Sequence, residues 1–288
     1  MAALRPGGLD RMGHSAMIRQ DHTGQGLGME LGLNGKVALV TGASRGIGRA
    51  IALSFAAEGC DLAVTGRDQG ALDETAAAIR DTGRKAVCSI LDLRQPGTEK
   101  TLIDTVKGEF GRLDILVNNA GATRRGNFFE LTDSDWADGY ALKLFAHMRL
   151  VRLAWPLLKA SKGSFVSIGG TSGRKPEAEF TIGSSVNAAV AAFTKCLADI
   201  GKEDGVQVNC VHPSLVETER QWKRIRAEVA ATGDSEDEVR KRFVKKMGFI
   251  RYGKVEDVAD LVTFLVSERA TWMHGATIDL DGGELGVL

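Results

Sequence analysis

Short apolar runs alternate with segments of helical period along most of this chain of 288 residues. The runs are Val37 to Val40, Leu62 to Thr65, Ala86 to Ser89, Ile115 to Val117, Phe165 to Ile168, Val206 to Val211 and Thr277 to Leu280. Between them apolar residues recur every three or four positions, as in Ile47, Ile51 and Phe55. Strands without polar alternation belong in a parallel sheet that helices cover on both faces. The alternation therefore predicts an α/β fold with one doubly wound sheet of seven parallel strands.

Residues 1 to 28 differ from the rest of the chain. They are rich in glycine, carry Arg, His and Gln, and hold no sustained apolar stretch. Such a segment buries too little apolar surface to order itself and has no secretory pattern, so we expect a disordered N-terminal extension. A single folded domain is predicted over 29 to 288, because no linker rich in Pro, Gly or Ser divides that range.

Composition excludes several classes of protein. Lys plus Arg equals Asp plus Glu at 37 each, so no net charge points to nucleic acid or to an anionic membrane. No apolar run reaches the length of a bilayer span, and we expect a cytoplasmic protein. The five histidines are scattered without a second ligand at metal spacing, which predicts no metal site. We expect four reduced thiols in or near the core, at Cys60, Cys88, Cys196 and Cys210.

A glycine-rich loop follows the first apolar run. It reads TGASRGIG, Thr41 to Gly48, and an amphipathic segment comes directly after it. Glycines at 42, 46 and 48 allow a tight turn, a close approach to a pyrophosphate and close packing of helix on strand. The helix start adds free amides and a favourable dipole for an anion. Because a strand precedes the loop and a helix follows it, the motif predicts a dinucleotide site rather than an ordinary turn.

Further motifs fit one family. NNAG follows the fourth run at Asn118 to Gly121, VNCVHP spans Val208 to Pro213, and DGG closes the seventh run at Asp281 to Gly283. Over about residues 33 to 284 the chain resembles the short-chain dehydrogenase/reductase family, and within it the β-ketoacyl reductases. The resemblance implies a Rossmann-like domain that binds NAD(P) and a small-molecule substrate.

The resemblance also implies which residues hold the cofactor. Asp92 would bond the adenine amino group, Asn118 would brace the sheet beside it, and the Thr218 hydroxyl would meet the carboxamide. Each can instead be an ordinary cap or turn residue. The full predicted set is Gly42, Ser44, Arg45, Gly46, Ile47, Gly48, Arg67, Asp92, Leu93, Asn118, Ala120, Gly121, Pro213, Val216 and Thr218.

The end of the second run favours NADP(H) over NAD(H). Gly66 stands where NAD-preferring members of the family carry an acidic residue for the ribose 2′-hydroxyl. No carboxylate therefore repels a 2′-phosphate there. Arg67 follows directly and Arg45 lies in the glycine loop, so two guanidinium groups can bind that phosphate. The alternative is that both arginines are solvated surface charges.

All four positions at which the family carries its proton-handling residues are changed. Gly170 stands at the serine position and Lys143 at the asparagine position. Gly183 and Asn187 stand at the positions of the tyrosine and of the lysine four residues later. In the family the tyrosine gives a proton to the substrate oxygen, with its pKa lowered by the ammonium. Glycine has no proton to give, so another group must act or the reaction differs.

A shifted alignment does not restore the tyrosine–lysine pair. The chain holds only Tyr140 and Tyr252, and neither is followed by lysine at the fourth position. Lys143 is the main substitute, because the family turns this helix position toward the catalytic centre. We hypothesise that its ammonium stabilises charge or donates the proton, with a pKa lowered by burial; the alternative is a lysine that reaches outward to solvent. Weaker candidates are His147, Thr171, Ser172, Glu177, Glu179, His212 and Ser214.

A substrate lid is predicted at about 217 to 250. It reads as two helices broken near Thr232, Gly233 and Asp234. Its basic residues outnumber its acids, which suits an anionic or carrier-linked substrate, although a solvated helical face has the same composition. Trp222 and Phe243 either line an apolar pocket or pack the lid down.

We therefore expect an atypical NADP(H)-binding oxidoreductase that acts on a carbonyl or alcohol, with Lys143 in place of the usual residues. A catalytically inactive nucleotide-binding regulator or scaffold is the first alternative, and a non-redox lyase or isomerase is the second. Relatives commonly assemble through two long helices, and an apolar stripe predicts a homotetramer or homodimer here, although part of that stripe must be core. The stripe consists of Leu150, Leu153, Leu157, Val190, Phe193 and Leu197.

Overall fold

The computed structural model describes residues 30–286. All the elements described lie within Gly32–Leu288. The predicted disordered extension at 1–28 lies outside the described residues, and so do residues 287 and 288.

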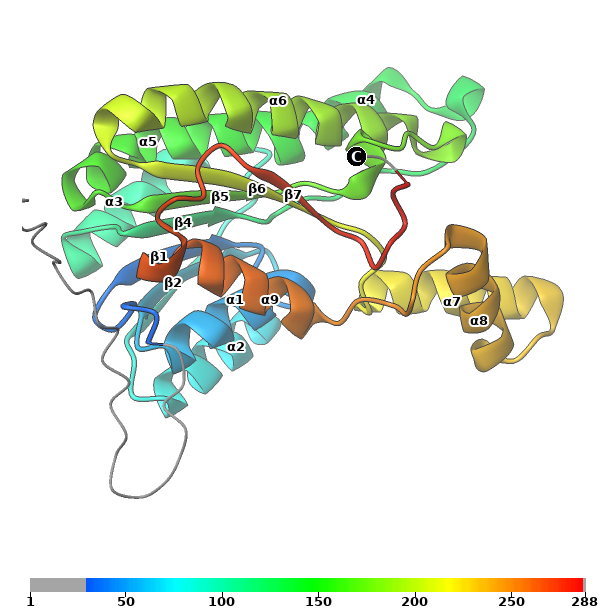
Figure 1. The fold of residues 1–288 in the computed structure, drawn as a ribbon, viewed down its shortest axis with the longest axis horizontal. Coiled ribbons are helices and arrows are strands. Elements are labelled where there is room, and N and C mark those ends of the chain that lie inside the picture. The colour runs from blue at the N-terminus through cyan, green and yellow to red at the C-terminus, as the bar shows by residue number, and fades with distance from the viewer. Residues whose placement is uncertain (1–29, 287–288) are drawn as a thin grey trace, which may run out of the picture. The chain divides into compact units, whose positions relative to one another are not determined.

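Seven parallel strands form one sheet in the order β3-β2-β1-β4-β5-β6-β7 (Figure 1). They are β1 (Val37–Thr41), β2 (Asp61–Gly66), β3 (Ala86–Ile90), β4 (Ile115–Asn118), β5 (Ser164–Ile168), β6 (Gln207–Pro213) and β7 (Thr277–Leu280). Every neighbouring pair runs parallel. Each residue of β1, β4 and β5 is buried, which is why these strands read as unbroken apolar runs. The predicted fold class is confirmed.

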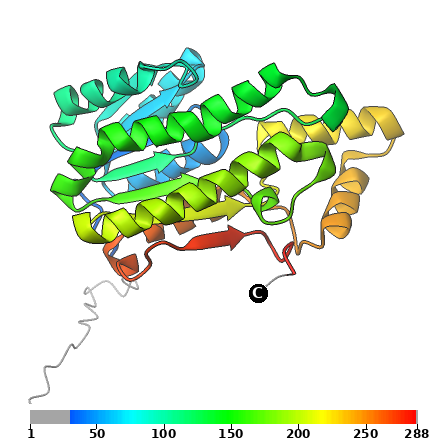
Figure 2. The same cartoon turned by 90° about the horizontal axis from the view of Figure 1, so that it is seen from above.

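Helices cover both faces of the sheet. One face carries α1 (Gly46–Ala57), α2 (Gln69–Asp81) and α9 (Val255–Leu265); the other carries α3 (Thr98–Phe110), α5 (Ala146–Ser161) and α6 (Thr181–Asp204) (Figures 1 and 2). A short helix α4 (Asp133–Tyr140) passes into α5 through a single π-helical segment, Ala141–Phe145. Such wide turns are rare and often mark functional sites. Here the turn contains Lys143.

One hydrophobic core lies between the sheet and the layer of α3, α5 and α6. Leu39, Leu116 and Phe165 from the strands meet Leu102 and Leu150 from the helices, and all are almost completely buried. Burying one such side chain contributes about 1.5–3 kcal/mol. The core thus fixes the strands whose carboxyl ends carry the predicted site.

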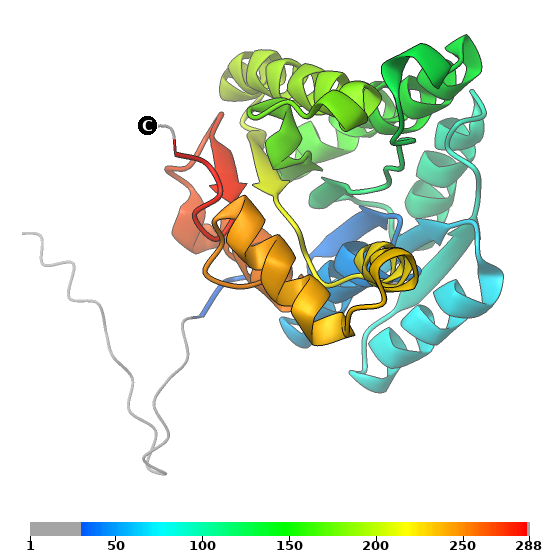
Figure 3. The same ribbon diagram turned by 90° about the vertical axis from the view of Figure 1, so that its right-hand side faces the viewer.

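The predicted lid segment holds the two expected helices, α7 (Glu219–Thr232) and α8 (Glu236–Met247) (Figure 3). Gly233, with φ of 77°, ends α7 in a left-handed conformation that glycine adopts without strain. Ser235 and Glu238 then form a capping box that starts α8. Ile225 and Phe243 pack into a small apolar cluster of this segment, so Phe243 holds the two helices together.

Two sequence predictions about side-chain exposure hold for only some of their residues. Cys60 and Cys210 are buried and Cys88 is half-buried, but Cys196 is exposed because it lies on the outer side of α6. Within the apolar stripe Leu150 and Val190 belong to the core, whereas Leu153 is 38% exposed. Across 30–286 no helix is long and apolar enough to cross a membrane, and no three His, Cys, Asp or Glu side chains are grouped as metal ligands.

Candidate active site

A ligand crevice is expected at the carboxyl ends of β1 and β4. The strand order reverses between these two strands, so the loops that follow them lead away in opposite directions. Every predicted cofactor-binding residue lies at the carboxyl end of a strand or in the loop and helix start that follow it. They are Gly42, Ser44, Arg45, Gly46, Ile47 and Gly48 after β1, Arg67 after β2, Asp92 and Leu93 after β3, Asn118, Ala120 and Gly121 at β4, and Pro213, Val216 and Thr218 at β6.

The glycine loop is crowded by its own backbone. A Cβ at residue 48 would lie 2.3 Å from the Gly42 carbonyl oxygen, so the start of α1 packs on the loop only because residue 48 is glycine. Gly42 has φ of 67° and Gly46 φ of 57°, which glycine adopts freely. No side chain caps the first amides of α1, and its first turn holds no acid. These amides are therefore free to bind an anion, and a pyrophosphate fits this geometry.

Thr41 joins the glycine loop to the loop after β4. Its hydroxyl oxygen accepts the amide N–H of Asn119 at 2.9 Å and of Ala120 at 3.0 Å. The Asn119 side chain donates to the Thr41 carbonyl at 2.9 Å. Asn118 is fully buried and donates to the His147 carbonyl in α5 at 3.1 Å, so it braces the sheet against that helix. The two walls of the crevice are thus held at a fixed separation.

Arg67 and Asp92 meet at the far end of the crevice. The nearest guanidinium and carboxylate atoms are 3.6 Å apart, and Arg94 donates to the other Asp92 oxygen at 3.2 Å. Burial raises the pKa of Asp92, but hydrogen bonds from Arg94 and the charges of Arg94 and Arg67 outweigh it and lower the pKa overall. Gly66 lies beside Ser44, and no carboxylate stands at that point. Arg67 remains more than half exposed and can turn toward a ligand.

The position predicted for serine is filled by a different side chain. A Cβ at Gly170 would lie 2.7 Å from the Asn187 amide nitrogen. That nitrogen donates to the Ser172 hydroxyl at 2.9 Å, and both residues are buried. Ser172 is therefore engaged with Asn187, and Asn187 fills the space that a serine at 170 would need.

The position predicted for tyrosine is likewise filled. A Cβ at Gly183 would lie 2.1 Å from the ring of Phe180, which covers the helix at this point. The guanidinium of Arg125 stacks on that ring at 4.1 Å and makes a bidentate ion pair with Glu177, at 2.7 and 2.9 Å. Glu177, a weak sequence candidate for the pocket, thus helps to fix Phe180 above Gly183.

Lys143 reaches into the cleft. Its ammonium donates to the Gly169 carbonyl at 3.0 Å, and its carbon chain would lie 3.0 Å from a Cβ at Gly121. Burial lowers its pKa to about 8, and the charge of Arg220 adds to that effect. The alternative of an outward-reaching lysine is wrong: the wide turn at 141–145 aims this side chain between the loops after β4 and β5.

Two fully buried histidines flank Lys143. His147 shares a hydrogen bond of 3.0 Å with the Ala120 carbonyl, and His212 packs against Gly169. Burial lowers the pKa of each to about 4, so both are neutral at pH 7. The Nδ1 atom of His212 is 3.6 Å from the Asp279 carboxylate in β7, a partner that sequence reasoning did not identify.

Glu284 ties the loops after β5 and β6 together. Its carboxylate accepts hydrogen bonds from the Thr171 hydroxyl at 3.1 Å and from the Ser214 hydroxyl. Its side chain is only 5% exposed, and Lys175 lies 3.8 Å away. Thr171 and Ser214 are thus held as loop contacts. No local sequence signal marked Glu284, because its partner Thr171 is 113 residues distant.

The short chain dehydrogenase family model matches residues 36–229. The chain belongs to the short-chain dehydrogenase/reductase family. An uncharacterised oxidoreductase of Mycobacterium tuberculosis is 33% identical over 253 residues, which cover 87% of this chain and 92% of that protein. The 3-oxoacyl-[acyl-carrier-protein] reductase FabG of Escherichia coli is 30% identical over 257 residues, which cover 88% of this chain and 98% of that protein.

Solved structures of the short-chain dehydrogenase/reductase family agree with this fold. L-sorbose reductase from Gluconobacter frateurii, complexed with NADPH and L-sorbose, is 31% identical and superposes with a TM-score of 0.87 over 90% of this chain and 100% of that chain. A short chain dehydrogenase from Burkholderia cenocepacia in complex with NADP is 35% identical, with a TM-score of 0.77 over 88% of this chain and 98% of that chain.

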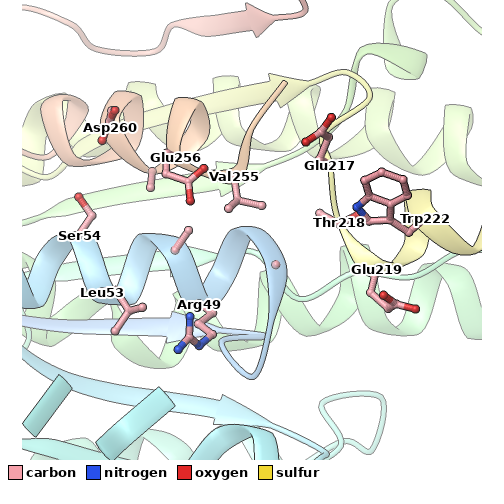
Figure 4. A pocket seen from close by; sticks show the side chains of 13 residues that line it. Arg49, Leu53, Ser54, Glu217, Thr218, Glu219, Trp222, Val255, Glu256 and Asp260 are labelled. Carbon is pink, nitrogen blue, oxygen red and sulfur yellow. The ribbon is translucent and has the colours of Figure 1, made fainter. Parts of the chain in front are cut away.

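One cavity lies away from Gly121 and Gly169. A cavity of about 500 Å³ opens between α1, α9 and the start of α7. Arg49, Glu217, Trp222 and Asp260 are among its lining side chains (Figure 4). Lys143 does not line it. The cavity borders the glycine loop only through Gly46 and Thr218, so we do not assign it to the reacting part of a substrate.

Proposed function

We propose that the protein is an NADP(H)-dependent oxidoreductase that interconverts a carbonyl and an alcohol, with Lys143 as the proton donor. The observation that carries the proposal is the position of Lys143, whose carbon chain lies against Gly121 and whose ammonium meets the Gly169 carbonyl. Lys143 has no ion pair among the described residues. Its pKa of about 8 is close to the value that suits a proton donor at neutral pH.

Each residue of the site would have a separate task. A bound reduced nicotinamide supplies the hydride. The Gly169 carbonyl holds the Lys143 ammonium at 3.0 Å and orients it toward the cleft. As the substrate carbonyl becomes an alcohol, Lys143 gives one proton to its oxygen and is left as a neutral amine. Neutral His147 and His212 add no competing charge to this centre.

NADP(H) is the proposed cofactor. The absence of an acid at Gly66 and the exposed guanidinium groups of Arg45 and Arg67 support it. The relatives complexed with NADPH and with NADP support the same choice. We further propose a cytoplasmic homo-oligomer that forms through α5 and α6, where Leu153 stays partly exposed.

A non-catalytic nucleotide-binding protein is the second candidate. Phe180 over Gly183 and Asn187 beside Gly170 favour it, because these side chains fill the family's usual catalytic space. In that case Lys143 would serve only to fix the Gly169 loop.

Absorbance of reduced nicotinamide separates the candidates. NADPH oxidation is measured with an acetoacetyl thioester and with L-sorbose, using wild type, Lys143→Ala and the surface control Lys107→Ala. We expect turnover by wild type and the control, and a loss of about 10²-fold or more in Lys143→Ala. Equal turnover by Lys143→Ala would exclude its role as proton donor. Tight NADPH binding with no oxidation by any carbonyl probe would support the non-catalytic protein, and product formation without NADPH oxidation would support a lyase or isomerase.

A further inference from the structure

Two cationic side chains from different elements converge on Gly121. Arg220, in the first turn of α7, crosses the cleft and donates to the Gly121 carbonyl at 2.7 Å. Lys143 lies against the same glycine from the side of α5, at 3.0 Å from the position of a Cβ. The carbonyl of Gly121 takes one N–H of the Arg220 guanidinium, which leaves the remaining donors free for a ligand.

No carboxylate balances these charges. Neither Arg220, Lys143 nor the neighbouring Arg45 has an ion pair with another residue of 30–286. Burial lowers the pKa of Arg220, and the charge of Arg45 lowers it further. Arg220 keeps solvent-exposed surface, so water screens part of this repulsion. Like charges that face one cleft without a counter-ion favour the binding of an anion there.

Four other basic residues of the lid are paired within it. Arg226 contacts Glu219 at 2.5 Å, Lys241 contacts Asp237 at 2.7 Å, and Arg242 contacts Asp234 at 2.5 Å. Arg240 pairs with Glu217. The charges of these four residues are therefore balanced within the lid. Arg220 differs from these residues because it leaves the lid and reaches the loop after β4.

We propose that Arg220 binds an anionic group of the substrate, a carboxylate or a phosphate, while the substrate carbonyl faces Lys143. The proposal rests on the oxidoreductase function given above. A guanidinium binds either anion through two parallel charge-assisted hydrogen bonds, which also fixes the orientation of the carbonyl. Arg45, at the start of α1, is left for the phosphates of the dinucleotide.

Matched charged and neutral probes test this site. Binding to the NADP⁺-loaded protein is measured by calorimetry for acetoacetate against its ethyl ester, and for dihydroxyacetone phosphate against dihydroxyacetone. We expect at least one anion to bind about ten- to a hundredfold more tightly than its neutral partner. Arg220→Gln should remove that difference, and Arg220→Lys should keep part of it. Arg226→Gln, on the same helix but paired with Glu219, should keep all of it.

The same variants distinguish whether Arg220 binds an anionic group of the substrate or of the cofactor. If Arg220→Gln weakens NADPH binding and leaves the preference for charged probes intact, Arg220 serves the cofactor and the proposal is overturned. Equal or undetectable binding of both members of both pairs to wild type overturns it as well. A preference for anions without NADPH oxidation would sustain the anion site but count against the oxidoreductase function, so the two failures are distinguishable.

Discussion

Glycine is needed both in the loop after β1 and at Gly170 and Gly183, which lie after β5 and in α6, but for opposite physical reasons. At Gly48 the obstacle to a side chain is backbone, the Gly42 carbonyl oxygen at 2.3 Å. At Gly183 and Gly170 the obstacle is another side chain, Phe180 or Asn187. Backbone atoms crowd the first region, whereas side chains crowd the second. The comparison predicts that a side chain added to the glycine loop disrupts it. At Gly170 and Gly183, in contrast, the side chains that fill the space can be exchanged for others.

The largest effect is expected at Gly48. Gly48→Val places carbon atoms against the Gly42 carbonyl and forces α1 away from the loop. NADPH affinity measured by calorimetry should fall by about 1,000-fold or more, which corresponds to about 4 kcal/mol. Gly108→Val is the matched control, because it lies in α3 and nothing lies within 4 Å of its Cβ position. Retention of NADPH affinity in Gly48→Val would contradict the backbone argument.

Restoring tyrosine at Gly183 is expected to have the next largest effect. The new side chain meets the Phe180 ring, and such overpacking costs about 3 kcal/mol in the free energy of unfolding. Phe180→Ala combined with Gly183→Tyr should recover much of that loss, because the ring is the obstacle. Urea unfolding of the two single variants and the double variant measures the coupling. Additive losses would mean that Phe180 does not block this position.

Lys143 should make both stability and rate depend on pH. Its pKa falls from 10.5 in the unfolded chain to about 8 in the folded protein. Below pH 8 the folded state carries the full penalty of a buried charge. Between pH 8 and 10.5 the folded protein has lost a proton that the unfolded chain still binds, so stability rises with pH.

The free energy of unfolding of wild type should therefore rise by about 3 kcal/mol relative to Lys143→Met across this interval. In the direction of reduction the rate should fall as pH rises through about 8, because the proton donor is lost. Urea titrations and NADPH oxidation at several pH values provide the measurements. If the difference in stability between wild type and Lys143→Met does not change with pH, the pKa of Lys143 is not lowered in the folded protein.

The smallest effect is expected at the exposed end of the cofactor region. Arg67→Asp should weaken NADPH binding about tenfold and strengthen NADH binding, since an acid at this place repels the 2′-phosphate and accepts the 2′-hydroxyl. Lys107→Asp, an exposed residue of α3 with the same change of charge, should alter neither affinity. An equal loss in both variants would show only a general effect of net charge.

The sheet and the glycine loop could be predicted because their signals are local. An unbroken apolar run is a strand that is buried on both faces, and each predicted run overlaps an observed strand closely, as at Val37–Thr41 and Gln207–Pro213. The break between the lid helices was likewise marked by its own residues, with Gly233 at its centre. The prediction that Lys143, Gly170, Gly183 and Asn187 replace catalytic residues depended on the family pattern alone.

What filled those positions could not be predicted. Phe180 lies only three residues before Gly183, yet its direction is fixed by Arg125 and Glu177, whose ion pair spans 52 residues. Arg220 reaches Gly121 across 99 residues. Composition also does not show which basic residues of the lid are paired with acids. These contacts depend on how distant loops meet once the sheet has formed.

The π-helical turn between α4 and α5 makes the direction of Lys143 depend on chain length as well as on residue type. Ala141–Phe145 fit one wide turn where an α-helix would use fewer residues. Removing one residue there would restore regular α geometry and rotate the preceding part of the helix by about 100° relative to α5. A relative that has lysine at the aligned position but lacks the extra residue would point it away from Gly169. The wide turn, and not only the residue type, therefore decides whether the Lys143 ammonium meets the Gly169 carbonyl.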